Sequence, residues 1–216
     1  ILDLGCAEGE LSIYLAKKGH LVTAADISEK QLGKIINKIK NTNLKIDTLS
    51  CDIENNVKVF NNDTYDYIFF MDVIEHVKNP TQTLENIRTL LNNNGQLIIH
   101  TPNNCSFYKF LRYMIRPRKR QNYYNLDKLG DFHLQGYDYL TIEKTLNFIG
   151  IKVIKIIPTK LSFPIINRFS FFNFLFNIMG FLFPMLSDTL LLVCEKSDPI
   201  DIDELIENWK KKDTNY

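Results

Sequence analysis

Short apolar runs alternate with amphipathic segments along most of the chain, and this alternation constrains the fold more than any other feature. Seven runs have the length and composition of strands, over residues 1–4, 21–26, 44–52, 65–71, 96–102, 151–157 and 189–195. Helices are predicted between them, over residues 10–18, 28–40, 80–91 and 141–148. Strands that are joined through helices pair mostly in parallel. The pattern therefore predicts an α/β fold with a doubly wound, seven-stranded sheet.

The first strand leads directly into a loop of small residues, within ILDLGCAEGE, and then into a helix. Glycines lack a Cβ atom, so Gly5 and Gly9 allow the backbone to approach a ligand closely, and the helix behind them offers free N–H groups. This arrangement is typical of a nucleotide-binding site. The dinucleotide fingerprint G-x-G-x-x-G fails at its third glycine, where the chain has Glu10, and this disfavours an NAD-type oxidoreductase.

Composition limits the other classes of function. With 216 residues and 45% hydrophobic content, the chain can bury one sizeable core, and a formal net charge of +1 makes nucleic acid an unlikely partner. The four cysteines form no C-x-x-C pair, which is typical of reduced thiols and of a cytoplasmic protein. No signal peptide is visible, and because the sequence starts within a strand, we expect N-terminal helices to be missing from it.

Four motifs at predicted strand ends resemble class I S-adenosylmethionine-dependent methyltransferases, in the branch of the ubiquinone-type O-methyltransferases. The glycine loop resembles the D/E-x-G-x-G-x-G motif of that family, with Asp3 as the acid and Ala7 at the middle glycine. Asp26 closes the second strand, where the family places an acid on the ribose hydroxyls, and Asp52 stands where an acid lies near the adenine amine. The segments YDYIFFMDVIEHVKNP and NNNGQLIIHTPN match the fourth and fifth strands.

The resemblance implies a Rossmann-like methyltransferase fold with an antiparallel last strand, and S-adenosylmethionine as the cofactor. Its binding residues are expected to be Asp3, Gly5, Cys6, Ala7, Gly9, Asp26, Ile27, Asp52, Ile53, Met71 and Asp72. The expected reaction is O-methylation of a small-molecule, glycan or lipid-linked hydroxyl, with 2′-O-methylation of RNA ends as an alternative. Two alternatives belong to other classes, a cofactor-binding protein without turnover and the NAD-type oxidoreductase.

The candidate catalytic groups lie in DVIEHV, after the fourth strand. In a helical turn, Asp72, Glu75 and His76 stand at i, i+3 and i+4, so they share one face and can form a base cluster or a cation site. Metal-dependent O-methyltransferases carry E-x-x-E-H here and a further histidine beyond strand five. The resemblance to them implies a divalent metal held by Asp72, Glu75, His76 and His133, with Asp72 in place of the first glutamate.

The alternative is a metal-free site, in which Glu75 supports catalysis and His76 or His133 acts as a base or a hydrogen-bond donor. In the simplest interpretation both histidines are structural. No such constellation surrounds His20 or His100, which we expect to be structural.

Residues 1–197 are predicted to form the methyltransferase domain, with two inserts and a separate tail. The basic insert, residues 112–124, is either a solvated face or a phosphate-recognition segment. The apolar insert, residues 159–188, is too interrupted by polar residues for a spanning helix, so its stretch 161–188 is expected in the core, in a homodimer or at a membrane surface. Residues 198–216 are predicted to form an amphipathic helical tail. The two inserts together suit a substrate with an anionic head and a lipid tail.

Overall fold

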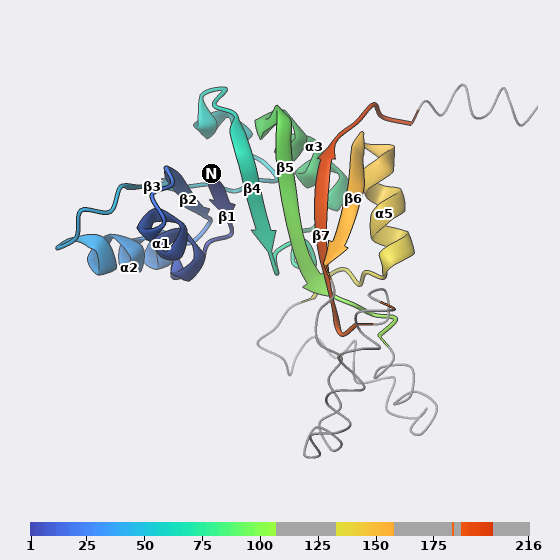
Figure 1. Cartoon of the computed structure of the whole chain (residues 1–216), viewed down its shortest axis with the longest axis horizontal. Coiled ribbons are helices and arrows are strands. Elements are labelled where there is room, and N and C mark those ends of the chain that lie inside the picture. Colours follow the sequence, from blue (N-terminus) through green and yellow to red (C-terminus); the bar gives the residue numbers. More distant parts are fainter. Residues whose placement is uncertain (107–132, 158–182, 184–186, 201–216) are drawn as a thin grey trace, which may run out of the picture.

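The computed structural model describes residues 1–106, 133–157, 183 and 187–200. Seven strands form one sheet in the order β3-β2-β1-β4-β5-β7-β6 (Figure 1). Adjacent strands from β3 to β5 pair in parallel, and β7 pairs antiparallel with both β5 and β6. The sheet confirms the predicted fold class, including the antiparallel last strand. The strands are β1 (Leu2–Leu4), β2 (Val22–Asp26), β3 (Ile46–Ser50), β4 (Tyr65–Met71), β5 (Leu91–Pro102), β6 (Ile151–Ile157) and β7 (Thr189–Lys196).

Helices cover both faces of the sheet. Ala24 belongs to a core cluster with residues of α1 and α2, whereas Ala25 belongs to a second cluster with residues of α3 and α5. Because consecutive strand residues point to opposite faces, these two clusters are the two layers of core on either side of the sheet. The helices are α1 (Glu10–Lys17), α2 (Glu29–Ile39), α3 (Pro80–Leu90) and α5 (Tyr139–Phe148), with the short 3-10 helix η1 (Val57–Phe60).

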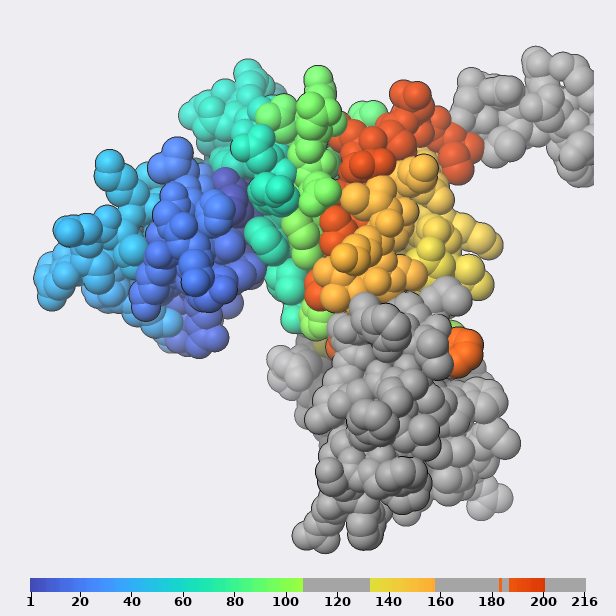
Figure 2. Space-filling model, in the orientation of Figure 1, coloured from blue at the N-terminus to red at the C-terminus, as the bar shows by residue number. Residues whose placement is uncertain are grey.

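The strand order has a switch point where the cofactor site is expected. The connection after β1 leads outward to β2, and the connection after β4 leads in the opposite direction to β5, although β1 and β4 are neighbours. In open α/β sheets, ligands bind at such a switch point, beyond the carboxyl ends of the strands. The glycine loop and the DVIEHV segment therefore start at adjacent positions. Figure 2 shows β4 and β5 in the middle of the described part, between the N-terminal elements and β6 with α5.

The fifth strand differs most from its predicted bounds. It was predicted over residues 96–102, but β5 already starts at Leu91. Its pairing with β4 shifts in register, since Tyr65 pairs with Leu91 and Tyr67 pairs with Gln96. Gly95 is buried in this irregular stretch, where an added Cβ atom would lie 2.8 Å from the Tyr65 carbonyl oxygen. Close packing against β4 thus explains why this position is a glycine.

Most of the predicted inserts lie outside the described residues. The basic insert 112–124 lies there entirely, and only residues 183, 187 and 188 of the apolar insert 159–188 are described. Of the tail 198–216, only residues 198–200 are described, so the division into domain, inserts and tail stays a prediction. Within the part of the chain that the structure describes, no helix combines the length and the apolar character needed to cross a membrane.

Candidate functional site

The glycine loop after β1 has a backbone that side chains would obstruct. Gly5 and Gly9 have φ angles of 76° and 73°, in the left-handed region, and Ala7 between them has a φ angle of 45°. A Cβ atom on Gly5 would lie 2.3 Å from Val73 Cγ2, and one on Gly9 would lie 2.6 Å from Ile35 Cδ1. The loop is therefore packed closely against both α2 and the segment after β4. Its backbone is also tied to β2, because the Gly5 and Cys6 N–H groups donate to the Ala25 carbonyl oxygen at 2.8 and 3.1 Å.

Asp26 ties the glycine loop to the end of β2. Its Oδ2 atom accepts a hydrogen bond from the Ala7 N–H at 2.9 Å, and its Oδ1 atom accepts one from the Ser28 N–H at 2.8 Å. Each carboxylate oxygen can accept a second bond, so the pair of oxygens stays available to two vicinal hydroxyl groups. The adjacent Ile27 side chain is 70% exposed, although it is large and apolar. Both features are compatible with cofactor binding by Asp26 and Ile27, which stays a prediction.

Asp3 lies beneath the loop rather than on its surface. It is 3% exposed, and its Oδ2 atom accepts a hydrogen bond from the Ser12 hydroxyl on α1. Burial raises the pKa of the Asp3 carboxyl above its ordinary value, despite the bond from Ser12. The bond joins the end of β1 to the helix beyond the loop. A direct contact between Asp3 and a cofactor stays a prediction.

Cys6 is unsuited to nucleophilic chemistry. Burial, together with the nearby charges of Asp3 and Asp26, raises the pKa of the Cys6 thiol to about 12. The thiol therefore stays protonated at neutral pH, and only the thiolate is a strong nucleophile. Its position in the loop is compatible with a packing contact to a bound ligand.

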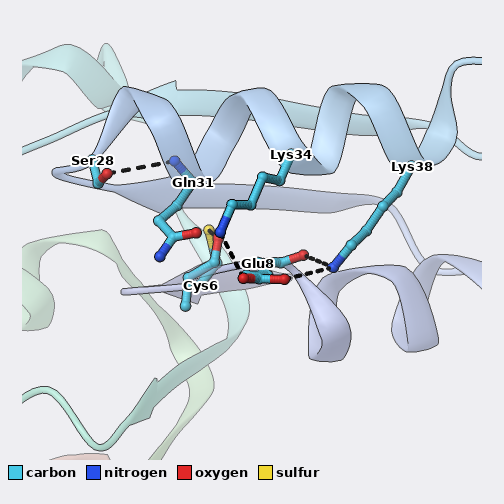
Figure 3. Close-up of polar contacts among 7 residues, drawn as sticks. Cys6, Glu8, Ser28, Gln31, Lys34 and Lys38 are labelled. Atoms are coloured by element: carbon cyan, nitrogen blue, oxygen red, sulfur yellow. Dashed lines mark hydrogen bonds and ion pairs between the residues drawn. The ribbon is translucent and has the colours of Figure 1, made fainter.

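Glu8 at the tip of the loop contacts α2, a feature that sequence reasoning missed. Its carboxylate lies 2.7 Å from Lys34 Nζ and 3.4 Å from Lys38 Nζ, and Lys38 also donates to the Glu8 carbonyl oxygen at 2.9 Å (Figure 3). In the same view, Ser28 caps α2 by accepting from the Gln31 N–H at 3.4 Å. The signal in the sequence is the spacing of the two lysines at i and i+4, which places both on one helix face.

Asp52 lies on the loop after β3, beside the end of β2. The Cys51 N–H donates to the Asp26 carbonyl oxygen at 3.0 Å, which brings the two predicted acids onto adjacent loops. The Asp52 carboxylate accepts from the Glu54 N–H at 3.0 Å and from Asn55 Nδ2 at 2.8 Å. Ile53 is 7% exposed and belongs to the core, so it supports this loop from below.

The structure corrects the expected geometry of Asp72. No helical turn starts there, because Asp72 has a φ angle of 55° and the following turn is closed by a bond from the His76 N–H to the Val73 carbonyl oxygen. The Asp72 carboxylate instead lies 2.8 Å from His100 Nδ1. Asp72 therefore does not share a face with Glu75 and His76. It follows Met71, the last residue of β4, which is half-buried at the same edge of the sheet.

Glu75, His76 and His133 come together as predicted, in a group we call the acceptor cluster. One possible ligand atom from each lies within 4.8 Å of the others. Glu75 is 2% exposed and accepts from the Thr101 hydroxyl at 3.1 Å, while its carbonyl oxygen accepts from the Leu134 N–H at 2.7 Å. The two imidazole rings meet edge to face, with 4.9 Å between their centroids. Glu75 thus fixes the segment that carries His133.

The donors of the acceptor cluster fit a divalent transition metal. Two imidazoles and one carboxylate suit Zn²⁺, Mn²⁺ or Fe²⁺, and ligands bound to one ion stand about 3 to 4 Å apart, so small movements would suffice. Tyr137 lies next to the cluster with 6% exposure, and its hydroxyl has no hydrogen-bond partner among the described residues. Burial and the charge of Glu75 raise the pKa of Tyr137 to about 12, so the hydroxyl stays a donor at neutral pH.

Comparisons with known proteins agree with this geometry. A family model described as "Methyltransferase domain" matches residues 1–142. The ubiquinone biosynthesis O-methyltransferase of Coxiella burnetii is 35% identical over 103 residues, which are 48% of this chain and 43% of that protein. The chain thus matches less than half the length of this curated relative.

Solved structures show the same fold at lower identity. The magnesium protoporphyrin IX methyltransferase of Synechocystis PCC 6803, with bound S-adenosylhomocysteine, has a TM-score of 0.60 and 18% identity, covering 91% of this chain and 73% of that one. An S-adenosylmethionine-dependent methyltransferase of Clostridium acetobutylicum has a TM-score of 0.61 and 16% identity, covering 91% and 83%.

Proposed function

Because this chain belongs to the methyltransferase domain family and has the class I methyltransferase fold, we propose that it is an S-adenosylmethionine-dependent O-methyltransferase. The observation that carries the proposal is the position of Asp26. Its carboxylate stands beside the glycine loop, at the switch point of the sheet, with lone pairs left for two ribose hydroxyls. The cofactor supplies a methyl group on a positively charged sulfur, which is already activated for transfer.

Each part of the proposed cofactor site has a task that its chemistry suits. Asp26 binds the ribose hydroxyls, the exposed Ile27 packs on the adenine, and Asp52 lies near the adenine amine. The loop from Gly5 to Gly9 lies against the methionine moiety, and its two glycines allow the backbone to approach that moiety closely. The methyl group must be in line with the attacking oxygen, so the bound cofactor has to be held in one orientation.

We place the acceptor hydroxyl beyond the carboxyl ends of β4 and β5, the edge of the sheet at which the acceptor cluster of Glu75, His76 and His133 also lies. The cluster is compatible with two ways of preparing the hydroxyl for methylation, one with a metal ion and one without. If the three side chains hold a divalent ion, the ion supplies Lewis acidity that lowers the pKa of a bound hydroxyl. In the metal-free alternative, the same side chains orient the hydroxyl by hydrogen bonds, and the Tyr137 hydroxyl is a further donor nearby.

The acceptor we infer is a small-molecule or lipid-linked hydroxyl. The name of the Coxiella relative, an O-methyltransferase of ubiquinone biosynthesis, supports transfer to oxygen. The basic segment 112–124 and the apolar segment 161–188 support a substrate with an anionic head and an apolar tail, and with it a cytoplasmic enzyme that works at a membrane surface or as a homodimer. The net charge of +1 gives no support for an RNA acceptor.

A screen with isotopically labelled S-adenosylmethionine tests the proposal. Quinols, glycans, lipids and RNA ends are offered as acceptors, and products are identified by mass spectrometry with and without chelator. We expect labelled methyl on the oxygen of a quinol or lipid. Loss of turnover with chelator, and recovery with Mn²⁺ or Zn²⁺, would support a metal in the acceptor cluster. Absence of a labelled product from every class would contradict an O-methyltransferase, and labelled RNA alone would favour the alternative substrate.

A further inference from the structure

Asp72 and His100 form a second polar pair at the site, separate from the acceptor cluster. They stand at the carboxyl ends of the neighbouring strands β4 and β5, where Met71 is the pairing partner of His100. Two hydrogen bonds join them. The Asp72 N–H donates to the His100 carbonyl oxygen at 2.9 Å, and the Asp72 carboxylate meets His100 Nδ1 at 2.8 Å. The position of the imidazole is thus fixed by both the backbone and the side chain of Asp72.

The backbone of Asp72 is in the left-handed region, and in this conformation its carboxylate contacts the imidazole. A φ angle of 55° is uncommon for residues other than glycine, and such conformations cluster at functional sites. The pair is not part of the buried core, because the Asp72 side chain is 56% exposed and the His100 side chain is 22% exposed. Core packing therefore does not account for the strained conformation.

The pair lies on the face of the sheet that α1 covers. Phe69 packs against the core cluster of α1 and α2, and side chains two residues apart on a strand share a face, so Met71 points the same way. His100 is the pairing partner of Met71 and shares that face. Thr101, the next residue, points to the opposite face and donates to Glu75. Val73, next to Asp72, packs against Gly5 of the glycine loop, so the pair lies close to the proposed cofactor site.

We propose that His100 accepts the proton of the acceptor hydroxyl during methyl transfer, and that Asp72 is its positioning residue. The proposal rests on the function proposed above. In the step, the acceptor oxygen forms a bond to the methyl carbon, and the carbon–sulfur bond breaks with its electron pair left on sulfur. The hydroxyl proton passes to His100 Nε2, and the resulting imidazolium later releases it to water.

The hydrogen bond to Asp72 selects the tautomer that this step needs. A carboxylate is an acceptor only, so a neutral His100 carries its proton on Nδ1 and donates it to Asp72. The lone pair is then on Nε2, for which the described residues provide no hydrogen-bond partner. The carboxylate also stabilises the imidazolium that forms, as in other dyads of an acid and a histidine.

Kinetics of paired variants test the proposal, using the acceptor that gives a labelled product in the screen. We expect His100→Asn to lower kcat by about 10²- to 10⁴-fold, while its affinity for S-adenosylhomocysteine stays within about twofold of wild type. Asp72→Gly fits the backbone conformation without strain and removes only the carboxylate, so it should lower kcat by at least about tenfold. His20→Ala, at an exposed histidine between α1 and β2, is the matched control and should leave kcat unchanged. A wild-type kcat in His100→Asn would overturn the proposal.

The ring nitrogens of His100 provide a readout that needs no acceptor. Nitrogen NMR of the full chain, with S-adenosylhomocysteine added, should show the neutral His100 ring protonated on Nδ1, and Asp72→Asn should shift that signal. A neutral ring protonated on Nε2 would overturn the proposal, because that nitrogen could then accept no proton. If no acceptor gives a product, the proposed function fails, and the tautomer still decides whether His100 can be a base.

Discussion

At the scale of single residues, Gly5 is constrained both by its positive φ angle and by its close packing against Val73. A matched pair of substitutions can separate these two effects on stability. Gly5→Ala introduces a Cβ atom 2.3 Å from Val73 Cγ2 at a φ angle of 76°, whereas Gly19→Ala meets nothing within 4 Å at a φ angle of 89°. We expect Gly19→Ala to lower the free energy of unfolding by about 1 kcal/mol, through backbone strain alone. Gly5→Ala should cost about 2–4 kcal/mol, because overpacking adds to the strain. Urea unfolding measures both, and equal losses would contradict the packing at Gly5.

The buried carboxyl of Asp3 predicts a dependence of stability on pH. Its pKa is raised in the folded protein, so the folded state holds the proton more tightly than the unfolded state. The contribution of Asp3 to stability is therefore greatest at low pH, and it is lost as the pH rises from about the ordinary pKa of 3.8 through the folded pKa.

Asp3→Asn removes this titration and keeps a carbonyl oxygen for the Ser12 hydroxyl. We expect the free energy of unfolding of Asp3→Asn, relative to wild type, to increase as the pH rises from the ordinary pKa of 3.8 through the raised pKa of the folded protein. Urea unfolding at several pH values measures it, and Asp47→Asn, at an exposed acid on β3, is the control. A relative stability that decreases with pH would show that the pKa of Asp3 is lowered instead.

At the scale of elements, Arg88 joins α3 to the ends of β6 and β7. Its Nε atom donates to the Gly150 carbonyl oxygen and its Nη2 atom donates to the Ser197 carbonyl oxygen, each at 3.1 Å. We expect Arg88→Met to lower the free energy of unfolding by about 2–3 kcal/mol, because two partly buried carbonyl groups lose a charged donor. Lys144→Met, on the exposed side of α5, should change it by less than about 0.5 kcal/mol. Thermal or urea unfolding compares the two, and equal effects would contradict the role of Arg88.

The sequence predicts the bounds of helices and strands better than it predicts the contacts between residues of different elements. Periodicity and caps depend on neighbouring residues, so α3 and β6 appear within one residue of their predicted bounds. The turn at Asp72 was predicted as helical because Asp72, Glu75 and His76 have the i, i+3 and i+4 spacing of a helix face. Its left-handed backbone depends instead on the contact with His100, a residue of another strand. Long-range pairing of this kind leaves no local signal.

At the scale of the whole molecule, the strand order follows from the alternation of strands and helices, and motifs at strand ends then meet at one edge of the sheet. The grouping of Glu75, His76 and His133 was predicted from the resemblance to metal-dependent O-methyltransferases, and the fold shows how residues so far apart in sequence come together. The sequence did not predict that Asp72 pairs with His100 and stays apart from the acceptor cluster, because this depends on which face of β5 each side chain occupies. Thr101 and His100 are adjacent in sequence but lie on opposite faces.

The central claim is that the site beyond the carboxyl ends of β1 and β4 binds S-adenosylmethionine through Asp26, and titration calorimetry tests it directly. The wild-type chain should bind S-adenosylhomocysteine at one saturable site and should show no binding of NADH. Asp26→Ala should weaken that binding by roughly 1.5–3 kcal/mol, because it removes a charge-assisted acceptor, while Asp47→Ala should leave it unchanged. Binding of NADH in place of S-adenosylhomocysteine, or equal affinity in wild type and folded Asp26→Ala, would contradict the account.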